Sequence, residues 1–122
     1  MRLDKLEVKS DSRGSLVEAF KFPTDGQLFY VIVKPHESRG NHYHTHKTEH
    51  FLVIWGSAII TVKNRETGDV MKVETSGNKP IDVTITPDHT HNIVATDEGC
   101  ILLVWVSERF DEADPDTFAE EL

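Results

Sequence analysis

The sequence has only one cysteine, and this excludes an internal disulfide as a source of stability. That residue, Cys100, lies in the apolar run GCILLVWVS and is expected to be a buried core thiol. No apolar run reaches the roughly 18 residues that a transmembrane helix needs, and the opening MRLDKLEVKS contains no apolar signal core. We therefore expect a protein of the reducing cytoplasm that does not associate with a membrane.

Basic side chains are also scarce. The 122 residues include 13 Lys and Arg against 21 Asp and Glu, which gives a formal net charge of −8. Such a balance argues against nucleic acid as a partner, although a few converging basic groups could still hold a small anion. The length predicts a single domain over residues 1–122 with a real hydrophobic core.

The pattern of side chains is that of an all-β protein. Runs rich in Val, Ile, Thr and aromatic residues recur with turn residues between them. Glu66-Thr67-Gly68-Asp69 predicts a hairpin, and Gly56-Ser57 and Asp97-Glu98-Gly99 predict two further turns. Ten short strands fit a double-sheet jelly roll or small barrel. The predicted strands are Leu3–Lys9, Ser15–Phe20, Leu28–Val33, Asn41–His46, His50–Trp55, Ala58–Asn64, Val70–Thr75, Ile81–Thr86, His91–Ala95 and Ile101–Ser107.

The end of the chain differs from this pattern. Asp114-Pro115-Asp116 offers a helix N-cap followed by proline, so Thr117–Leu122 is predicted to form a short helix. The acidic tail Glu108–Leu122 is expected to cover a sheet edge. Trp55 and Trp105 lie in apolar strands and are expected to pack in the core.

The histidines are concentrated in two places. Five of the seven fall between positions 36 and 50, and the others are His89 and His91, just after Pro87. His42 and His44 are two residues apart, so on a strand both would point to one face. With Glu49 and a histidine of the second cluster, they make a ligand set suited to zinc, nickel or iron(II).

These spacings resemble the two motifs of the cupin superfamily. His42-x-His44-x4-Glu49-x6-Gly56 is similar to the first motif, and Pro87-x3-His91 is similar to the second. The resemblance implies a double-stranded β-helix with a divalent metal inside, zinc being expected, held by His42, His44, Glu49 and His91. Because Asp88 and His89 stand where the second motif has a glycine, His89 remains an alternative to His91.

A narrower resemblance covers roughly residues 10–118. Asp11-x-Arg13-Gly14-x-Leu16-x-Glu18 and Arg39-Gly40-x-His42 are similar to elements of sugar-nucleotide epimerases and ketoisomerases. The chain most resembles the C-terminal cupin domain of CapF-type capsular polysaccharide enzymes, in which this domain follows a reductase. The resemblance implies epimerisation beside the ketone of a UDP-linked 4-keto-6-deoxy sugar. Because no GxGxxG is present, the chain would correspond to the cupin half, with the reductase as a possible separate partner.

The same resemblance suggests further roles. Small cupins of this kind usually form homodimers, and Leu3–Lys9 is a natural strand to add to the sheet edge of a partner. Arg13 and Arg39 each precede a glycine, and at least one is expected to contact the diphosphate of the substrate.

The residue that moves the proton is left open. In a metal-free enzyme, His42 and His44 would themselves be catalytic. In a metal enzyme they would hold the ion, and the proton would pass to another group: His46, Lys47, Tyr43 or His89. His46 shares the strand parity of His42 and His44 and could therefore face inward. Two other functions also fit the ligand set: a non-catalytic sugar- or metal-binding cupin that docks onto a reductase, and an iron(II) dioxygenase.

Overall fold

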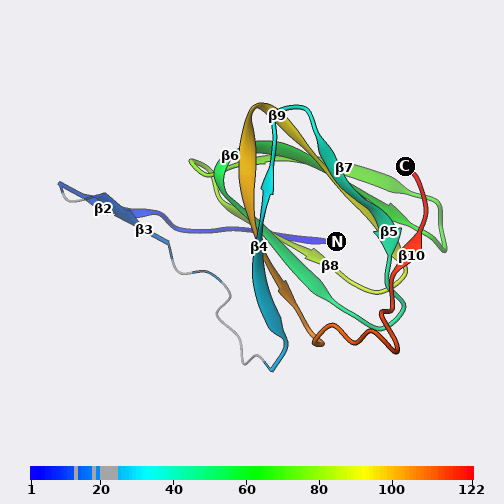
Figure 1. The fold of residues 1–122 in the computed structure, drawn as a ribbon. Coiled ribbons are helices and arrows are strands. Elements are labelled where there is room, and N and C mark those ends of the chain that lie inside the picture. Colours follow the sequence, from blue (N-terminus) through cyan, green and yellow to red (C-terminus); the bar gives the residue numbers. More distant parts are fainter. Residues whose placement is uncertain (13, 18, 20–24) are drawn as a thin grey trace.

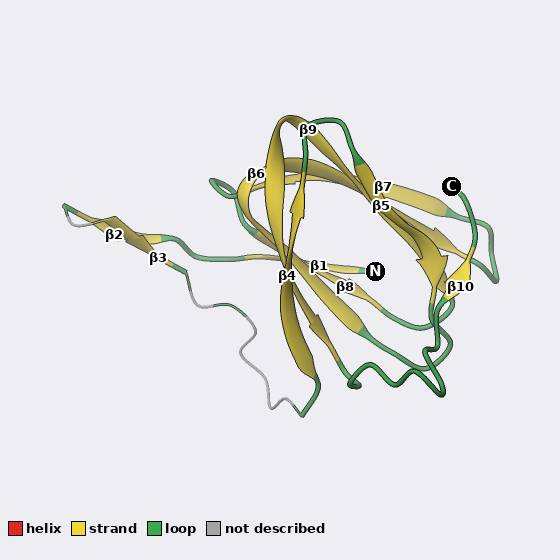
Figure 2. Ribbon diagram, in the orientation of Figure 1, coloured by secondary structure: helices red, strands yellow, loops and turns green. Residues whose placement is uncertain are grey.

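The computed structural model describes residues 1–12, 14–17, 19 and 25–122, which form strands joined by turns (Figures 1 and 2). No helix that could cross a membrane occurs among them. The strands in this part of the chain are β1 (Arg2–Lys5), β2 (Lys9–Asp11), β3 (Gly14–Leu16), β4 (Gln27–Val33), β5 (Ser38–Tyr43), β6 (Glu49–Asn64), β7 (Val70–Ser76), β8 (Ile81–Ile85), β9 (His89–Val106) and β10 (Phe118–Ala119).

Two long antiparallel strands, β6 and β9, organise the fold. The first half of β6 pairs with β8 and with the second half of β9, and β4 and β1 extend this layer on either side. The second half of β6 pairs with β7 and with the first half of β9, which also pairs with β5. The strands curl into a barrel in which these two layers face each other (Figure 1). The arrangement confirms the predicted all-β class, and it agrees with a jelly roll.

The two turns predicted at Gly56-Ser57 and Asp97-Glu98-Gly99 are bends within single strands. Gly56 and Gly99 have φ values of 72° and 75°, and β6 and β9 shift register beside Gly56. A side chain on Gly56 would collide with the backbone carbonyl of Gly99. The prediction of separate strands here was wrong because a left-handed glycine serves a β-bulge as well as a turn.

The hairpin predicted at residues 66–69 is confirmed between β6 and β7, where Gly68 donates its N–H to the Asn64 carbonyl. The helix predicted over Thr117–Leu122 is wrong. Phe118 and Ala119 form β10 and pair with Tyr43 and His42 at the free edge of β5 (Figure 2). Backbone pairing along that edge replaces helical hydrogen bonds, so the tail does cover a sheet edge as expected.

Alternate residues of each strand point into the barrel. This inner face holds the core, which includes Val53, Ile60, Val83, Ile93 and Cys100. Cys100 is buried, as predicted, at 1% exposure. The outer face beside β4 is unusually apolar: Leu28, Tyr30 and Ile32 are exposed. Trp55 was predicted in the core but is 52% exposed, because the register shift between Val53 and Trp55 breaks the inward alternation of β6.

The N-terminal segment leaves the barrel. β1 pairs with β8 of the same chain, while β2 and β3 pair with each other in a hairpin that projects from the body (Figure 1). The predicted strand Leu3–Lys9 is therefore split between β1 and β2. The predicted strand Ser15–Phe20 extends beyond the described residues, and Arg13 lies outside them.

Candidate metal and substrate site

A bulge in β5 turns two side chains into the barrel. Gly40 pairs with Asn92 and His42 with His91, so Asn41 is an extra residue on β5. Gly40 and Asn41 both have positive φ, and a Cβ on Gly40 would lie 2.7 Å from the His91 carbonyl oxygen. His42 lies three positions after Arg39, a spacing that would put them on opposite faces of a regular strand. The bulge brings both to the inner face, which explains the Arg-Gly-x-His pattern.

The inner face unites the four residues expected from the sequence. The ligand atoms of His42, His44, Glu49 and His91 lie within 4.8 Å of one another. His44 Nε2 lies 2.7 Å from Glu49 Oε1, and His91 Nε2 lies 3.1 Å from the same oxygen. Of the two histidines left open from the sequence, His91 lies in this group.

Backbone contacts fix the orientation of two of these rings. His44 Nδ1 donates to the carbonyl of Asp116 at 2.6 Å, and His91 Nδ1 donates to the carbonyl of His89 at 3.0 Å. Because a carbonyl can only accept, the proton of each neutral ring is on Nδ1, and Nε2 carries a lone pair. Both lone pairs face the carboxylate of Glu49.

In the neutral rings, two hydrogen-bond acceptors, the Nε2 atoms of His44 and His91, therefore face a third acceptor, the carboxylate of Glu49. His44 Nε2, His91 Nε2 and Glu49 Oε1 are buried, and none has a hydrogen-bond partner in the described part of the chain. Buried polar atoms without partners are costly, and converging lone pairs repel one another. A positive charge between them, either a metal ion or a proton on Nε2 of His44, removes both penalties. Two imidazoles and a carboxylate are the donors that a borderline divalent metal such as zinc prefers, so the residues fit such an ion.

Burial and neighbouring charges shift the pKa values of three members of this group. Burial raises the pKa of Glu49, but the contacts with His44 and His91 outweigh it and lower this pKa to about 2. Burial lowers the pKa of His44, but Glu49 and Asp116 outweigh it, so that the pKa is raised. Burial, followed by the neighbouring His91 and His44, lowers the pKa of His42 to about 4. At neutral pH, Glu49 is therefore ionised and His42 is neutral.

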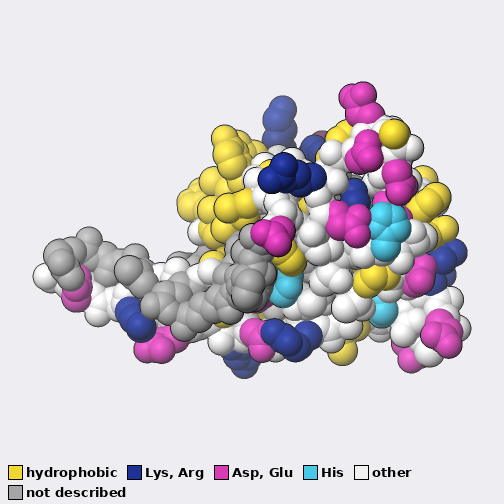
Figure 3. Space-filling view, turned by 90° about the horizontal axis from the view of Figure 1, so that it is seen from below, with side chains coloured by type: hydrophobic (Ala, Val, Ile, Leu, Met, Phe, Trp, Pro, Cys, Tyr) yellow, Lys and Arg dark blue, Asp and Glu magenta, His cyan; other side chains and the backbone are white. Residues whose placement is uncertain are grey.

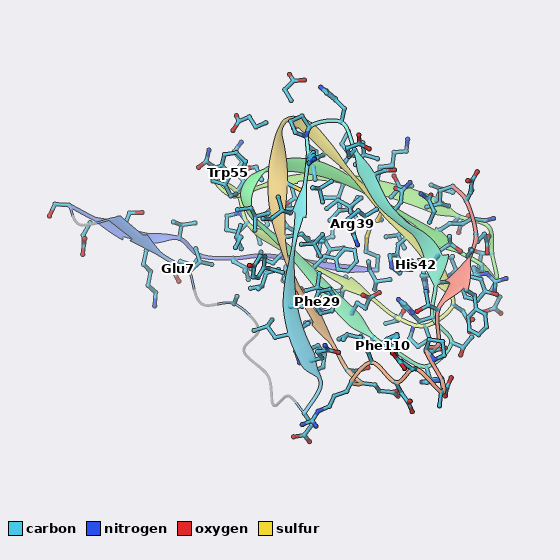
Figure 4. The ribbon with its side chains drawn as sticks, viewed as in Figure 1. Glu7, Phe29, Arg39, His42, Trp55 and Phe110 are labelled. Carbon is cyan, nitrogen blue, oxygen red and sulfur yellow. The ribbon has the colours of Figure 1, made fainter. Side chains whose placement is uncertain are left out.

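A cavity of about 220 Å³ opens beside this group. Figure 4 shows its labelled residues Phe29, Arg39 and His42 around the interior between β4 and β5, away from Trp55. The wall is mostly apolar, with the polar groups gathered at the His42 side. The lining residues are Phe29, Val31, Arg39, Gly40, His42, Glu49, Phe51, His91, Ile93, Leu102 and Val104. Sequence patterns did not single out the β4 side of this wall, since apolar strand residues give no signal that distinguishes a pocket from a core.

The other proposed proton carriers lie outside this lining. The Tyr43 ring stacks on Phe118 with centroids 5.3 Å apart, and the Arg65 guanidinium lies 3.7 Å from the Tyr43 ring centre. His89 Nδ1 contacts the carbonyl of Pro87. These contacts direct Tyr43 and His89 away from the cavity.

His46 and Lys47 face the C-terminal segment. β5 ends at Tyr43, so the parity expected to turn His46 inward does not extend to it. Its Nδ1 lies 2.8 Å from Glu108 Oε2, and the Lys47 Nζ donates to the carbonyl of Pro115 at 3.0 Å. Sequence reasoning missed the importance of this segment, in which Asp116 is buried against the histidines.

Comparisons with known proteins agree with the fold. Residues 9–118 match the family described as Polysaccharide biosynthesis C-terminal domain. Over 112 residues the chain is 42% identical to a UDP-2-acetamido-2,6-beta-L-arabino-hexul-4-ose reductase of Pseudomonas aeruginosa, a match covering 90% of this chain and 30% of the relative.

Solved structures of related proteins have a similar fold. The capsular polysaccharide assembling protein CapF from Staphylococcus aureus matches with a TM-score of 0.77 and 36% identity, over 96% of this chain and 34% of that one. A double mutant of the QdtA 3,4-ketoisomerase from Thermoanaerobacterium thermosaccharolyticum, in complex with TDP, matches with a TM-score of 0.80 and 26% identity, over 96% and 85%. The chain thus spans about a third of the length of the Pseudomonas relative and of CapF.

Proposed function

Because this chain belongs to the family of polysaccharide biosynthesis C-terminal domains, we propose that it is an epimerase or isomerase of a nucleotide-linked 4-keto-6-deoxy sugar. The name of the Pseudomonas relative describes a UDP-linked hexul-4-ose, and QdtA is a sugar ketoisomerase bound to TDP. The observation that carries the proposal is the cavity in which Arg39 and His42 stand beside the buried Glu49 group.

The chemistry of such a sugar makes specific demands. A ketone at C4 acidifies the hydrogens on C3 and C5. One group must remove a proton and a group must return it, while positive charge or a hydrogen-bond donor stabilises the developing enolate oxygen. The cavity wall is apolar away from the histidines, and an apolar wall strengthens electrostatic interactions beside it.

His42 is the residue that we propose to move the proton. It lines the cavity, it is half-buried, and its lowered pKa of about 4 means that the ring is neutral at pH 7. His44 and His91 are less suited, because each donates Nδ1 to a backbone carbonyl and turns Nε2 to Glu49.

His44, Glu49 and His91 would hold a divalent metal, and zinc is the ion that we propose. When bound, such an ion supplies positive charge to a nearby carbonyl oxygen. His42, whose ring centroid lies 4.8 Å from that of His91, would be free for the substrate. If His42 is instead the fourth ligand, its substitution will remove the metal as well as the activity.

Arg39 is proposed to contact the diphosphate of the nucleotide. Its exposed side chain is on the rim of the cavity, and guanidinium suits bidentate recognition of phosphate. Arg13 carries the same expectation from the sequence. The double substitution Arg13→Ala and Arg39→Ala should raise KM and affect kcat little, since contacts far from the reacting carbon contribute largely uniform binding.

The decisive experiment is solvent exchange. Incubation with UDP- and dTDP-linked 4-keto-6-deoxy sugars in deuterium oxide should place deuterium on C3 or C5. His44→Ala should reduce the exchange by orders of magnitude. His42→Gln should reduce it similarly while the protein retains its metal. If the sugars bind but no exchange occurs with any of them, the enzyme proposal fails and a non-catalytic cupin remains.

A homodimer is also proposed. Exposed apolar side chains gather on the side of the molecule from which the β2–β3 hairpin projects (Figure 3). Among the exposed apolar residues, Tyr30 of β4 is 69% exposed. An isolated two-stranded hairpin is marginally stable, and an apolar sheet face of this kind is usually covered. Deleting residues 1–9 should weaken association in sedimentation experiments. A full-length chain that is monomeric at tens of micromolar contradicts this part of the proposal.

A further inference from the structure

One residue of the C-terminal segment is buried although its surroundings are exposed. Residues 108–119 follow β9 and cross the outside of the barrel, and all of them are described. Every one is exposed except Asp116, at 2% exposure. A carboxylate in such a position needs strong partners, because burying an unpaired charge is costly.

The partners are successive residues of the loop between β5 and β6. Asp116 Oδ1 accepts the N–H of Thr45 at 2.8 Å and also the Thr45 hydroxyl. Asp116 Oδ2 accepts the N–H of His46 at 3.0 Å and that of Lys47 at 3.2 Å. Three consecutive backbone N–H groups therefore converge on one carboxylate. The conformation of residues 45–47 depends on this side chain, since no regular strand pairing holds them.

The backbone of the same residue contacts His44, one of the proposed metal ligands, directly. The Asp116 carbonyl accepts Nδ1 of His44, while Nε2 of that ring faces Glu49. Asp116 has a φ of 49°, a left-handed conformation that Asp and Asn tolerate better than most residues. Its carboxylate thus holds the loop that follows His44, and its carbonyl selects which ring nitrogen of His44 carries the proton.

Neighbouring contacts hold Asp116 at this place. Lys47 donates to the carbonyl of Pro115, the preceding residue. On the other side, Phe118 stacks on Tyr43 and pairs with it in β10. The segment is therefore attached to the loop at Pro115 and Asp116, and to β5 at Phe118.

We propose that Asp116 is a positioning residue that sets the tautomer and the direction of His44, and thereby the metal affinity of a site to which it contributes no ligand. The inference rests on the proposed metal-binding role of His44, Glu49 and His91. Outer hydrogen-bond partners of this kind typically change metal affinity by about 10- to 100-fold when they are removed.

The test compares zinc affinity among variants of the full chain. Asp116→Asn and Asp116→Gly both suit a positive φ, so each changes the carboxylate without adding backbone strain. Zinc competition against a chelating dye should show affinity at least about tenfold weaker in both. Asp114→Asn is the matched control. It removes the same charge from an exposed position in the same segment, and its affinity should stay within about twofold of the unaltered chain.

The unfolding temperature of the metal-free variants is measured in parallel. A role in stability alone would lower that temperature and leave the zinc affinity of the folded protein unchanged. This outcome would overturn the proposal, as would Asp116 variants that fold and bind zinc like the unaltered chain.

A measurement on the unaltered chain keeps the proposal testable if both variants fail to fold. Nitrogen NMR of the metal-free protein, taken at a pH high enough that the His44 ring is neutral, should find His44 as the Nδ1–H tautomer. The amide protons of Thr45, His46 and Lys47 should exchange slowly with solvent. The Nε2–H tautomer, or fast exchange at these amides, would overturn the proposal. If the unaltered chain binds no zinc, the metal proposal fails, and the tautomer and the exchange rates still decide the positioning role.

Discussion

Two neighbouring residues of β6 show how differently one strand can use histidine and carboxylate. Glu49 points into the barrel, where it faces His44 and His91. His50 points out, where its Nδ1 donates to Asp82 Oδ1 at 2.9 Å and lies 3.4 Å from the Thr84 hydroxyl. Both groups are buried.

The hydrogen bonds distinguish the two. The outer pair has a donor against an acceptor, as expected of a group that holds β6 and β8 together. In the inner group, the protons of His44 and His91 are used elsewhere and lone pairs face the carboxylate. A His–carboxylate contact is therefore no indication of a metal site by itself. The indication is the orientation of the rings by second partners.

The largest expected effect comes from removing the inner carboxylate. Glu49→Gln replaces an ionised oxygen ligand with a neutral amide, so zinc affinity should fall by more than about 100-fold. Asp82→Asn is the matched control on the outer face, where affinity should change by less than about twofold. Zinc titration against a chelating dye measures both. Equal losses of zinc affinity in the two variants would contradict the assignment of the metal site to Glu49 and not to Asp82.

The outer pair should instead matter for stability. Asp82→Asn replaces the charged acceptor of a buried hydrogen bond with a neutral amide, and we expect it to lower the free energy of unfolding by about 1–3 kcal/mol. Urea unfolding of the metal-free proteins gives this value. An unchanged free energy of unfolding would remove the structural role assigned to His50 and Asp82.

A smaller effect concerns the acid side of the stability profile. The pKa of His42 is about 4 in the folded protein, below its ordinary value of 6.5. Between these pH values the unfolded chain binds a proton that the folded protein does not, so this residue makes the free energy of unfolding decrease as the pH falls from 6.5 to 4.

His42→Gln should flatten this part of the profile by about 1 kcal/mol, a figure reduced because the side chain is partly exposed to solvent. Urea unfolding of metal-free protein at several pH values between 4 and 7 measures the slope. A variant with the same slope as the unaltered chain would show that His42 keeps its ordinary pKa.

The sequence was informative where a short pattern determines the geometry. The two-residue spacing of His42 and His44 predicted that both side chains point to one face. The hairpin at residues 66–69 has turn residues that specify it locally. These features depend on neighbours within a few residues.

The features that were missed depend on distant partners. Asp116 was interpreted as part of a helix N-cap, yet its carboxylate accepts the N–H groups of residues about 70 positions earlier. No residue near Asp114-Pro115-Asp116 indicates that the chain after it will pair with the edge of β5 and will not form a helix. Likewise, Gly56 and Gly99 carry the same local signal in a bulge as in a turn, and only the pairing of β6 with β9 decides between them.

The central claim, that the inner face holds a divalent metal, is tested most directly by the metal content of the protein purified without a His tag. Elemental analysis should find near-stoichiometric metal, with zinc expected. Metal below about a tenth of an equivalent, unchanged after zinc addition, would contradict the claim and favour a metal-free enzyme in which His42 acts as the base.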